Sequence, residues 1–137
     1  FAWLPGLAQN AAMARILVVD DEESILISLQ VLLETEGHEV VKTTNSEQAA
    51  GWLGQDKFDL LITDIRMVPI DGLELMRISR EKCPAMPFIA ISAYTSRKAV
   101  QESQNLGCMA YIKKPFKINE VVSVVNRVLF PAKPPAA

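Results

Sequence analysis

Five short apolar runs, separated by segments with a helical pattern, most constrain what this chain can fold into. They predict strands near residues 15–19, 39–43, 59–63, 87–92 and 109–112, and helices near 23–36, 46–54, 72–82, 96–106 and 118–129. Strands that alternate with helices in this way pair in parallel, because each helix carries the chain back across the sheet in a right-handed crossover. The sequence therefore predicts an α/β fold with a doubly wound, five-stranded parallel sheet.

The polarity of each run indicates the place of its strand in the sheet. The runs Ile16–Val19, Leu60–Ile62 and Phe88–Ile91 are continuously apolar, as expected for strands that are covered on both faces. The second run contains Glu39 and Lys42, and the last run is short, so both suit the edges of the sheet. These features predict the strand order 2-1-3-4-5, one of two common arrangements in doubly wound sheets.

The predicted helices differ in how many apolar residues they offer to a core. In the first and last helices, apolar residues recur at helical spacing and form one face each: Ile25, Leu29, Leu32 and Leu33, and then Ile118, Val121, Val122, Val125 and Leu129. Val124 and Val128 lie beside the second of these faces and are candidates for a partner-binding surface. The helix near 96–106 is mostly polar, and such weak apolar anchorage makes it a candidate for a segment that moves.

Composition limits the class of protein. The chain has 137 residues, half of them apolar, which suits one domain with a substantial core. The net charge of −2 gives no general reason to bind nucleic acid or a membrane surface, and no apolar stretch has the length of a membrane span. Cys83 and Cys108 lack the spacing of metal ligands, so we expect free thiols in a reducing cytoplasm.

The two ends of the chain depart from this pattern. Residues 1–13 open with Phe1 and reach a methionine only at Met13, so we expect a cloning remnant or a linker there. The segment 131–137 is rich in proline and alanine and cannot extend a helix, which suits a free tail or the start of a linker. The folded domain is expected over residues 14–130.

Polar residues stand where four of the strands are expected to end. Asp20 and Asp21 follow the first run, Asp64 follows the third, Ser92 ends the fourth and Lys114 follows the fifth. The carboxyl ends of parallel strands lie at one edge of a sheet, where open α/β folds place their sites. Carboxylates, a hydroxyl and an ammonium in one crevice favour a divalent cation and a phosphoryl group.

These residues also have simpler alternative roles. Asp20 and Asp21 could cap the next helix, but one acid suffices for a cap. Two carboxylates at about 4 Å repel by roughly 4 kcal/mol at an effective dielectric of 20, and a bound cation would relieve that repulsion. Asp64 could be an exposed loop residue, which fits poorly after so apolar a strand; there it suits a metal ligand or a nucleophile. We expect Lys114 to be the only cation in the crevice and Lys113 to point into solvent, because the residue before a proline is restricted.

Taken together, these residues resemble the receiver domain of bacterial response regulators, the phosphoacceptor half of two-component signalling. The resemblance covers about residues 14–130 and rests on five motifs in order and at consistent spacing: Ile16–Glu22, Leu61–Met67, Ile70–Gly72, Ile89–Ala93 and Tyr111–Phe116. It implies the flavodoxin-like receiver fold. It also implies a phosphorylation-controlled switch that catalyses at most its own phosphorylation and dephosphorylation.

The resemblance implies a role for each acidic residue of the crevice. Asp64 resembles the phosphoacceptor. Asp20, Asp21, Asp64 and the backbone carbonyl of Arg66 resemble the set of ligands that holds Mg²⁺ (or Mn²⁺).

Three further residues resemble the parts of the family that respond to the phosphate. Ser92 resembles the switch hydroxyl, and Lys114 resembles the family's lysine, with a cis peptide bond to Pro115. Tyr111 resembles the aromatic switch residue that turns inward when Ser92 moves toward the phosphate. Its alternative role is that of an ordinary half-buried tyrosine on an edge strand.

One position departs from the family pattern, in which a proline usually follows the methionine after the phosphoacceptor. Here Val68 follows Met67 and Pro69 comes next, so we expect the backbone of this loop to differ. Arg66 and Tyr94 stand at positions that tune how long the phosphate lasts in the family, and both are large here.

The resemblance also implies partners. They are a histidine kinase or a phosphotransfer protein, and an output domain or a downstream protein. The surface that changes would combine the helix near 96–106, the strand near 109–112 and the helix near 118–129, and a homodimer could use it. We expect a bacterial, cytoplasmic domain that itself contacts neither nucleic acid nor membrane.

Two other classes place acids in a similar fold. A phosphatase of the haloacid-dehalogenase type has a second Asp two residues after its nucleophile, but Arg66 stands two residues after Asp64, and Glu22 two after Asp20. A flavodoxin-like binding module needs a hydroxyl- and glycine-rich loop after the first strand, where this chain has a run of acids. Sustained hydrolysis of a generic phosphate ester would favour the phosphatase, and a colourless protein would count against the flavin module.

Overall fold

The computed structural model describes residues 13–131, and almost all of the two segments expected to lie outside the domain, 1–13 and 131–137, falls beyond them. Strands and helices alternate along the chain: β1 (Arg15–Val19), α2 (Glu23–Thr35), β2 (Glu39–Thr43), α3 (Ser46–Leu53), β3 (Leu60–Thr63), α4 (Gly72–Lys82), β4 (Phe88–Ser92), α5 (Arg97–Asn105), β5 (Tyr111–Lys113) and α6 (Ile118–Leu129). Each element lies within about two residues of its predicted bounds. No helix in this described part is long and apolar enough to cross a membrane.

The strands form one parallel sheet in the order β2-β1-β3-β4-β5, which confirms the predicted fold and strand order. The central strands β1, β3 and β4 are buried almost throughout, whereas β2 and β5 are partly exposed at the edges. Continuous apolar runs mark the strands that helices cover on both faces, because successive side chains point to opposite faces.

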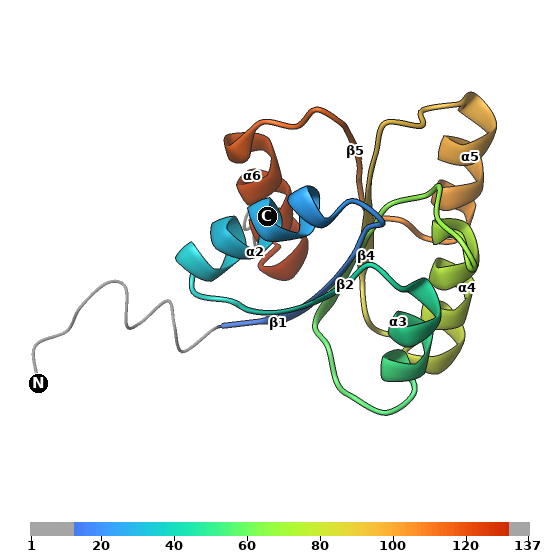
Figure 1. The fold of residues 1–137 in the computed structure, drawn as a ribbon, viewed down its shortest axis with the longest axis horizontal. Coiled ribbons are helices and arrows are strands. Elements are labelled where there is room, and N and C mark those ends of the chain that lie inside the picture. Colours follow the sequence, from blue (N-terminus) through green and yellow to red (C-terminus); the bar gives the residue numbers. More distant parts are fainter. Residues whose placement is uncertain (1–12, 132–137) are drawn as a thin grey trace, which may run out of the picture.

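Helices cover both faces of the sheet. Figure 1 shows α2 and α6 on one side and α3, α4 and α5 on the other. Each side has its own core, since alternate residues of β1 serve opposite faces: Ile16 and Val18 pack with α2 and α6, and Leu17 and Val19 pack with α3 and α4. Two cores that share one sheet hold the strand ends in a fixed relation.

The α2 and α6 faces differ from the predicted ones. In α2 the buried residues are Leu26, Leu29 and Leu33, and in α6 they are Val121, Val124 and Val125. The prediction that Val124 faces a partner is wrong, because Val124 is 7 % exposed in the core. Val128 packs against that core but is only partly buried, so its place on a partner-binding surface stays a prediction. Ile118, predicted to be buried, is 65 % exposed at the first position of α6.

The helix α5 is the least anchored one, as its polar sequence predicted. Only Ala99 and Ser103 are buried in it, compared with four buried residues in α4. A residue of α4 fixes its C-terminal end, because the Arg80 guanidinium donates two hydrogen bonds of 3.3 Å to the carbonyl of Leu106. Whether α5 moves stays a prediction.

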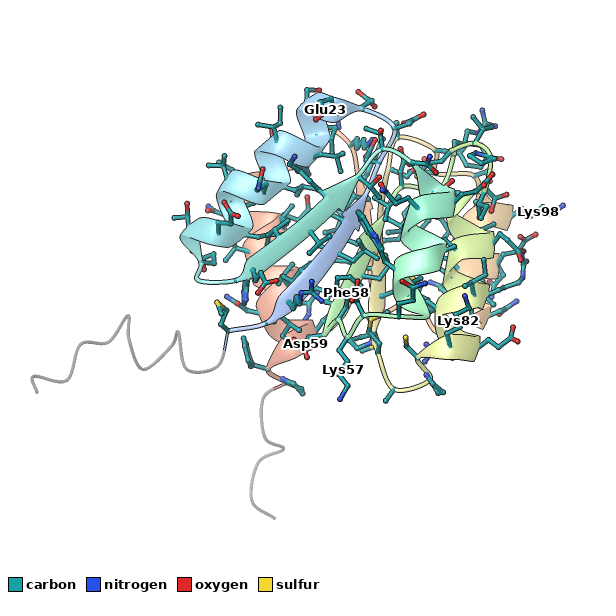
Figure 2. The ribbon with its side chains drawn as sticks, turned by 60° about the horizontal axis from the view of Figure 1, so that its bottom comes forward. Glu23, Lys57, Phe58, Asp59, Lys82 and Lys98 are labelled. Carbon is teal, nitrogen blue, oxygen red and sulfur yellow. The ribbon has the colours of Figure 1, made fainter. Side chains whose placement is uncertain are left out.

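The two ends of the sheet have different roles. Figure 2 shows Lys57, Phe58 and Asp59, which precede β3, at the end of the molecule opposite Glu23, where α2 begins. All strands are parallel, so Glu23 marks the end at which the predicted site residues follow their strands. In open α/β folds this is the end where sites form.

Gly72 is the point at which α4 approaches the end of β3. Its backbone N–H donates to the carbonyl of Ile65 at 2.7 Å, and a Cβ on Gly72 would lie 2.0 Å from the carbonyl oxygen of Asp64. Such a contact is sterically impossible without backbone movement. A glycine is therefore required for α4 to begin so close to Asp64.

We predict that Gly72→Ala lowers the free energy of unfolding by about 3 kcal/mol, the upper part of the range for overpacking a buried site. Chemical denaturation measures this change. Gly51→Ala is the matched control, because nothing lies within 4 Å of a Cβ at that helical position. There alanine should stabilise the protein by about 0.5–1 kcal/mol. A Gly72→Ala protein as stable as the wild type would contradict this description.

His38 is the single histidine of the chain and lies buried just before β2. Its Nδ1 accepts a hydrogen bond from Ala14 N–H at 3.2 Å, so this nitrogen carries no proton. The ring stacks on Phe130, with 6.5 Å between centroids. Burial lowers the pKa of His38, and the nearby Glu36 offsets part of this effect.

We predict that His38 makes stability depend on pH near its unfolded pKa of about 6.5. As the pH falls below that value, the unfolded chain takes up the proton before the folded one, so the free energy of unfolding decreases. Denaturation of the wild type and His38→Gln at several pH values checks this, because glutamine keeps an acceptor for Ala14 but does not titrate. Identical pH profiles for the two proteins would show that His38 has no such effect.

Candidate functional site

The acidic residues predicted from the sequence come together at the carboxyl edge of the sheet. Oxygen atoms of Asp20, Asp21, Glu22 and Asp64 all lie within 4.8 Å of one another. The pairing of β1 with β3 is in register, and the Asp64 N–H donates to the carbonyl of Val19 at 3.0 Å. The sheet itself therefore places the first acid loop next to Asp64.

Lys114 contacts this cluster from the carboxyl end of β5, the edge strand nearest to β4. Its Nζ lies 2.7 Å from Asp20 Oδ2, 3.0 Å from Asp64 Oδ2 and 3.3 Å from Glu22 Oε1. The Lys114 N–H donates to the carbonyl of Ser92, and the bond to the following proline is cis, as expected. Lys113 is exposed, also as expected, so the ammonium in the crevice is that of Lys114.

Charge and burial act against each other within this cluster. Burial on its own lowers the pKa of Lys114, but hydrogen bonds to Asp20 and Asp64 outweigh that effect and raise it above the usual lysine value. Burial raises the pKa of Asp20 to about 6, although hydrogen bonds from Lys114 and from the Glu22 N–H oppose the change. One ammonium compensates only part of the charge of several carboxylates.

Asp64 presents one oxygen to its own backbone and one to the crevice. Its Oδ1 accepts from the Ile65 N–H at 2.6 Å, while Oδ2 lies against Lys114. The residue is 6 % exposed. The crevice has a volume of about 350 Å³ and is lined by Asp21, Glu22, Asp64, Arg66, Ser92, Ala93, Tyr94 and Lys114. It is large enough for a phosphoryl group, and Asp64 stands in its wall.

Ser92 and Tyr111 are joined through the backbone of Tyr94. The Ser92 hydroxyl accepts from the Tyr94 N–H at 3.0 Å, and the Tyr111 hydroxyl donates to the Tyr94 carbonyl. Ser92 is buried, whereas Tyr111 is half-buried against the core that includes α4 and α5. A displacement of residues 92–94 would therefore reach both side chains predicted to switch.

The prediction that Lys114 is the only cation of the crevice is wrong. Arg66 also lines it, and its guanidinium carbon lies 3.8 Å from the centroid of the Tyr94 ring. Arg66 stands two residues after Asp64 and reaches Tyr94, which is far from it in sequence. The peptide bond between Val68 and Pro69 in the same loop is cis, which the sequence did not predict.

Glu22 is the member of the cluster to which the sequence analysis assigned no role. It is exposed, and its carboxylate contacts Lys114 at 3.3 Å. The signal for it was the run of four acids from Asp20 to Glu23, of which only the first two were assigned to the site. In the structure the third acid also turns toward the ammonium.

Comparison with known proteins supports the same assignment. The model of the response regulator receiver domain family matches residues 16–126. The chain is 36 % identical over 124 residues to the DNA-binding transcriptional regulator NtrC of Azospirillum brasilense, covering 90 % of this chain and 26 % of that protein. It spans between 26 % and 51 % of the length of the first curated relatives that it matches.

Solved structures show the same fold. A CheY-like response regulator receiver domain protein from Methanospirillum hungatei JF-1 has a TM-score of 0.83 and 31 % identity, covering 85 % of this chain and 94 % of that one. The response regulator TrrA of Thermotoga maritima, solved with Mg²⁺ and BeF, has a TM-score of 0.77 and 34 % identity, covering 85 % and 99 %. With the acid cluster and the lysine in place, the family match shows that this chain belongs to the response regulator receiver domain family.

Proposed function

We propose that this domain accepts a phosphoryl group on Asp64 from a histidine kinase or a phosphotransfer protein, in the presence of Mg²⁺ (or Mn²⁺). Phosphoacceptor activity is general to the receiver family. The observation that carries the proposal for this residue is the placement of Asp64, buried among acids with one carboxylate oxygen against the Lys114 ammonium. Asp20 is also buried against Lys114 at the end of a central strand, but of these two carboxylates only Asp64 lines the crevice.

The residues present fit a divalent cation. Four carboxylates face a single ammonium, and their oxygens gather within 4.8 Å. Mg²⁺ prefers a few oxygen ligands and retains water and phosphate oxygens. Asp20, Asp21, Asp64 and the Arg66 carbonyl would hold it, and the bound ion would neutralise charge on the phosphoryl oxygens.

The proposed reaction is the attack of an Asp64 oxygen on phosphorus. A new O–P bond forms as the P–N bond to the donor's histidine breaks, and the imidazole leaves with the electron pair of that bond. Lys114 stabilises the negative charge that accumulates on the phosphoryl oxygens, since it already lies against the oxygen of Asp64. Burial of Asp64 limits the access of competing water.

The proposed switch runs from the phosphate through Ser92 to α5. If the Ser92 hydroxyl turns to the phosphate, it no longer accepts the hydrogen bond from the Tyr94 N–H. Because the Tyr94 carbonyl accepts from the Tyr111 hydroxyl, a movement of Tyr94 would also move Tyr111. The surface of α5, β5 and α6 would then change and control an output domain, a downstream protein or a homodimer. We propose a cytoplasmic role in which this domain itself contacts neither nucleic acid nor membrane.

The contact of Arg66 with Tyr94 bears on how long the phosphate lasts. The stacked pair lines the crevice beside Asp64 and narrows the approach of an attacking water. The same two residues are the ones whose positions tune this lifetime in the family. We therefore propose that they slow hydrolysis of the phosphorylated form.

The two alternative classes gain no support from the site. A haloacid-dehalogenase-type phosphatase needs a second acid after its nucleophile, and the side chain two residues after Asp64 is the Arg66 guanidinium stacked on Tyr94. A flavin phosphate bound after β1 would meet Asp20, Asp21 and Glu22, whose charges repel it. Receiver domains are signalling switches rather than enzymes that turn over other substrates.

We predict that substitutions of the acids and of the lysine have opposite effects on stability without Mg²⁺. Asp64→Asn, like Asp20→Ala, removes one of several mutually repelling carboxylates and should raise stability by about 1 kcal/mol. Lys114→Ala leaves buried carboxylates without their partner and should lower stability by about 3–5 kcal/mol.

Thermal melting in a chelator tests both changes. Lys113→Ala is the matched control, because Lys113 is exposed and neighbours Lys114 in sequence, so it should change little. A decrease of several degrees for Asp64→Asn would show that the crowding of charges is not the dominant effect.

We predict that a small acyl phosphate adds one phosphoryl group to the wild type when Mg²⁺ is present, and none when Mg²⁺ is chelated. Intact mass measures the addition. Asp64→Asn should show no addition, whereas Asp71→Asn, an exposed acid that caps α4, should react as the wild type does. Modification of Asp64→Asn at the wild-type rate would disprove the assignment of the site.

A further inference from the structure

The loop between β3 and α4 carries the phosphoacceptor at its start, and its middle is anchored by the buried side chain of Met67 but by almost no backbone hydrogen bonds. Its ends are fixed by the hydrogen bond between Gly72 N–H and the carbonyl of Ile65 and by Asp71, which caps α4. Among residues 13–131, the backbone of residues 66–70 makes a single hydrogen bond, from the Ile70 N–H to the Ser46 hydroxyl at 3.0 Å. This bond crosses 24 residues of sequence.

Ser46 is a firm anchor because its own surroundings are fixed. It is fully buried at the first position of α3, where Asn45 caps the helix by accepting from Gln48 N–H at 3.1 Å. The Thr43 hydroxyl accepts from Asn45 N–H at 3.0 Å and donates to Gln48 Oε1 at 2.7 Å. The corner from Thr43 to Ser46 is therefore rigid.

The same corner contacts the first acid loop. The Thr43 carbonyl accepts from the Asp20 N–H at 3.3 Å, in continuation of the pairing between β1 and β2. The loop that carries Asp20 and Asp21 and the loop that carries Arg66 are thus tied to one short segment between β2 and α3. These are the two loops that would supply ligands to a cation.

We propose that Ser46 is a positioning residue for the metal site. Its hydroxyl holds the backbone of residues 66–70, and with it the Arg66 carbonyl, in a fixed place relative to the acids. The inference rests on the proposed function, because it concerns the same Mg²⁺ site. Groups that orient metal ligands typically change metal affinity by 10–100-fold when they are removed.

Two serine substitutions test this role in the full chain. Ser46→Ala removes the acceptor of Ile70, and we expect about 10-fold weaker Mg²⁺ binding by calorimetric titration. Ser79→Ala is the matched control, because Ser79 is also fully buried and its hydroxyl has no hydrogen-bond partner. Its Mg²⁺ affinity should equal that of the wild type. Amide hydrogen exchange at residue 70 should accelerate in Ser46→Ala only.

Two results would overturn the inference. One is an unchanged Mg²⁺ dissociation constant in Ser46→Ala, and the other is unchanged exchange at residue 70. If Ser46→Ala does not fold, Ser46→Cys replaces it, since a thiol is a weaker acceptor for the Ile70 N–H; unchanged affinity there overturns the inference as well. A wild-type protein that binds no Mg²⁺ contradicts the proposed function itself, whereas normal binding in both the wild type and Ser46→Ala contradicts only the role of Ser46.

Discussion

The site depends on one ammonium that several carboxylates share. Lys114 lies within 3.3 Å of oxygens from Asp20, Glu22 and Asp64, which come from two other parts of the chain. Burying a charge is costly unless a partner compensates it, so neither the acids nor the lysine could occupy this place alone. The acids still outnumber the lysine, and burial raises the pKa of Asp20 to about 6 although the hydrogen bond from Lys114 opposes that change. The excess of negative charge favours binding of a cation, and when no cation is bound Lys114 limits the repulsion between the carboxylates.

The position of the cluster follows from the sheet, and this part was predictable from sequence. Val19 pairs with Thr63 in register, so the residues that come next, Asp20 and Asp64, are neighbours. The sequence marks both positions, because each apolar run stops at an acid. The strand order was predictable for a related reason, since runs buried on both faces must lie in the middle of the sheet.

Other features depend on packing that the sequence pattern does not specify. Valines at five positions of α6 form two overlapping stripes, and only contact with the sheet and α2 selects the one that includes Val124. Arg66 contacts Tyr94, 28 residues away in sequence, and Ile70 donates a hydrogen bond to Ser46, 24 residues away. A serine at the start of a helix is common for local reasons, so nothing in its sequence context indicated a partner in another loop.

The distribution of burial suits the proposed switch. The strands that end just before Asp20 and Asp64 are buried almost throughout, so phosphorylation would leave them in place. Tyr94 follows β4 by two residues, and α5, which comes next, buries only two of its nine residues. Free energy supplied at the phosphate would therefore be taken up most easily by the segment from Ser92 to α5, because few apolar contacts oppose its movement. Since Arg80 holds the far end of that helix at Leu106, the movement would be greatest near the crevice, where α5 begins.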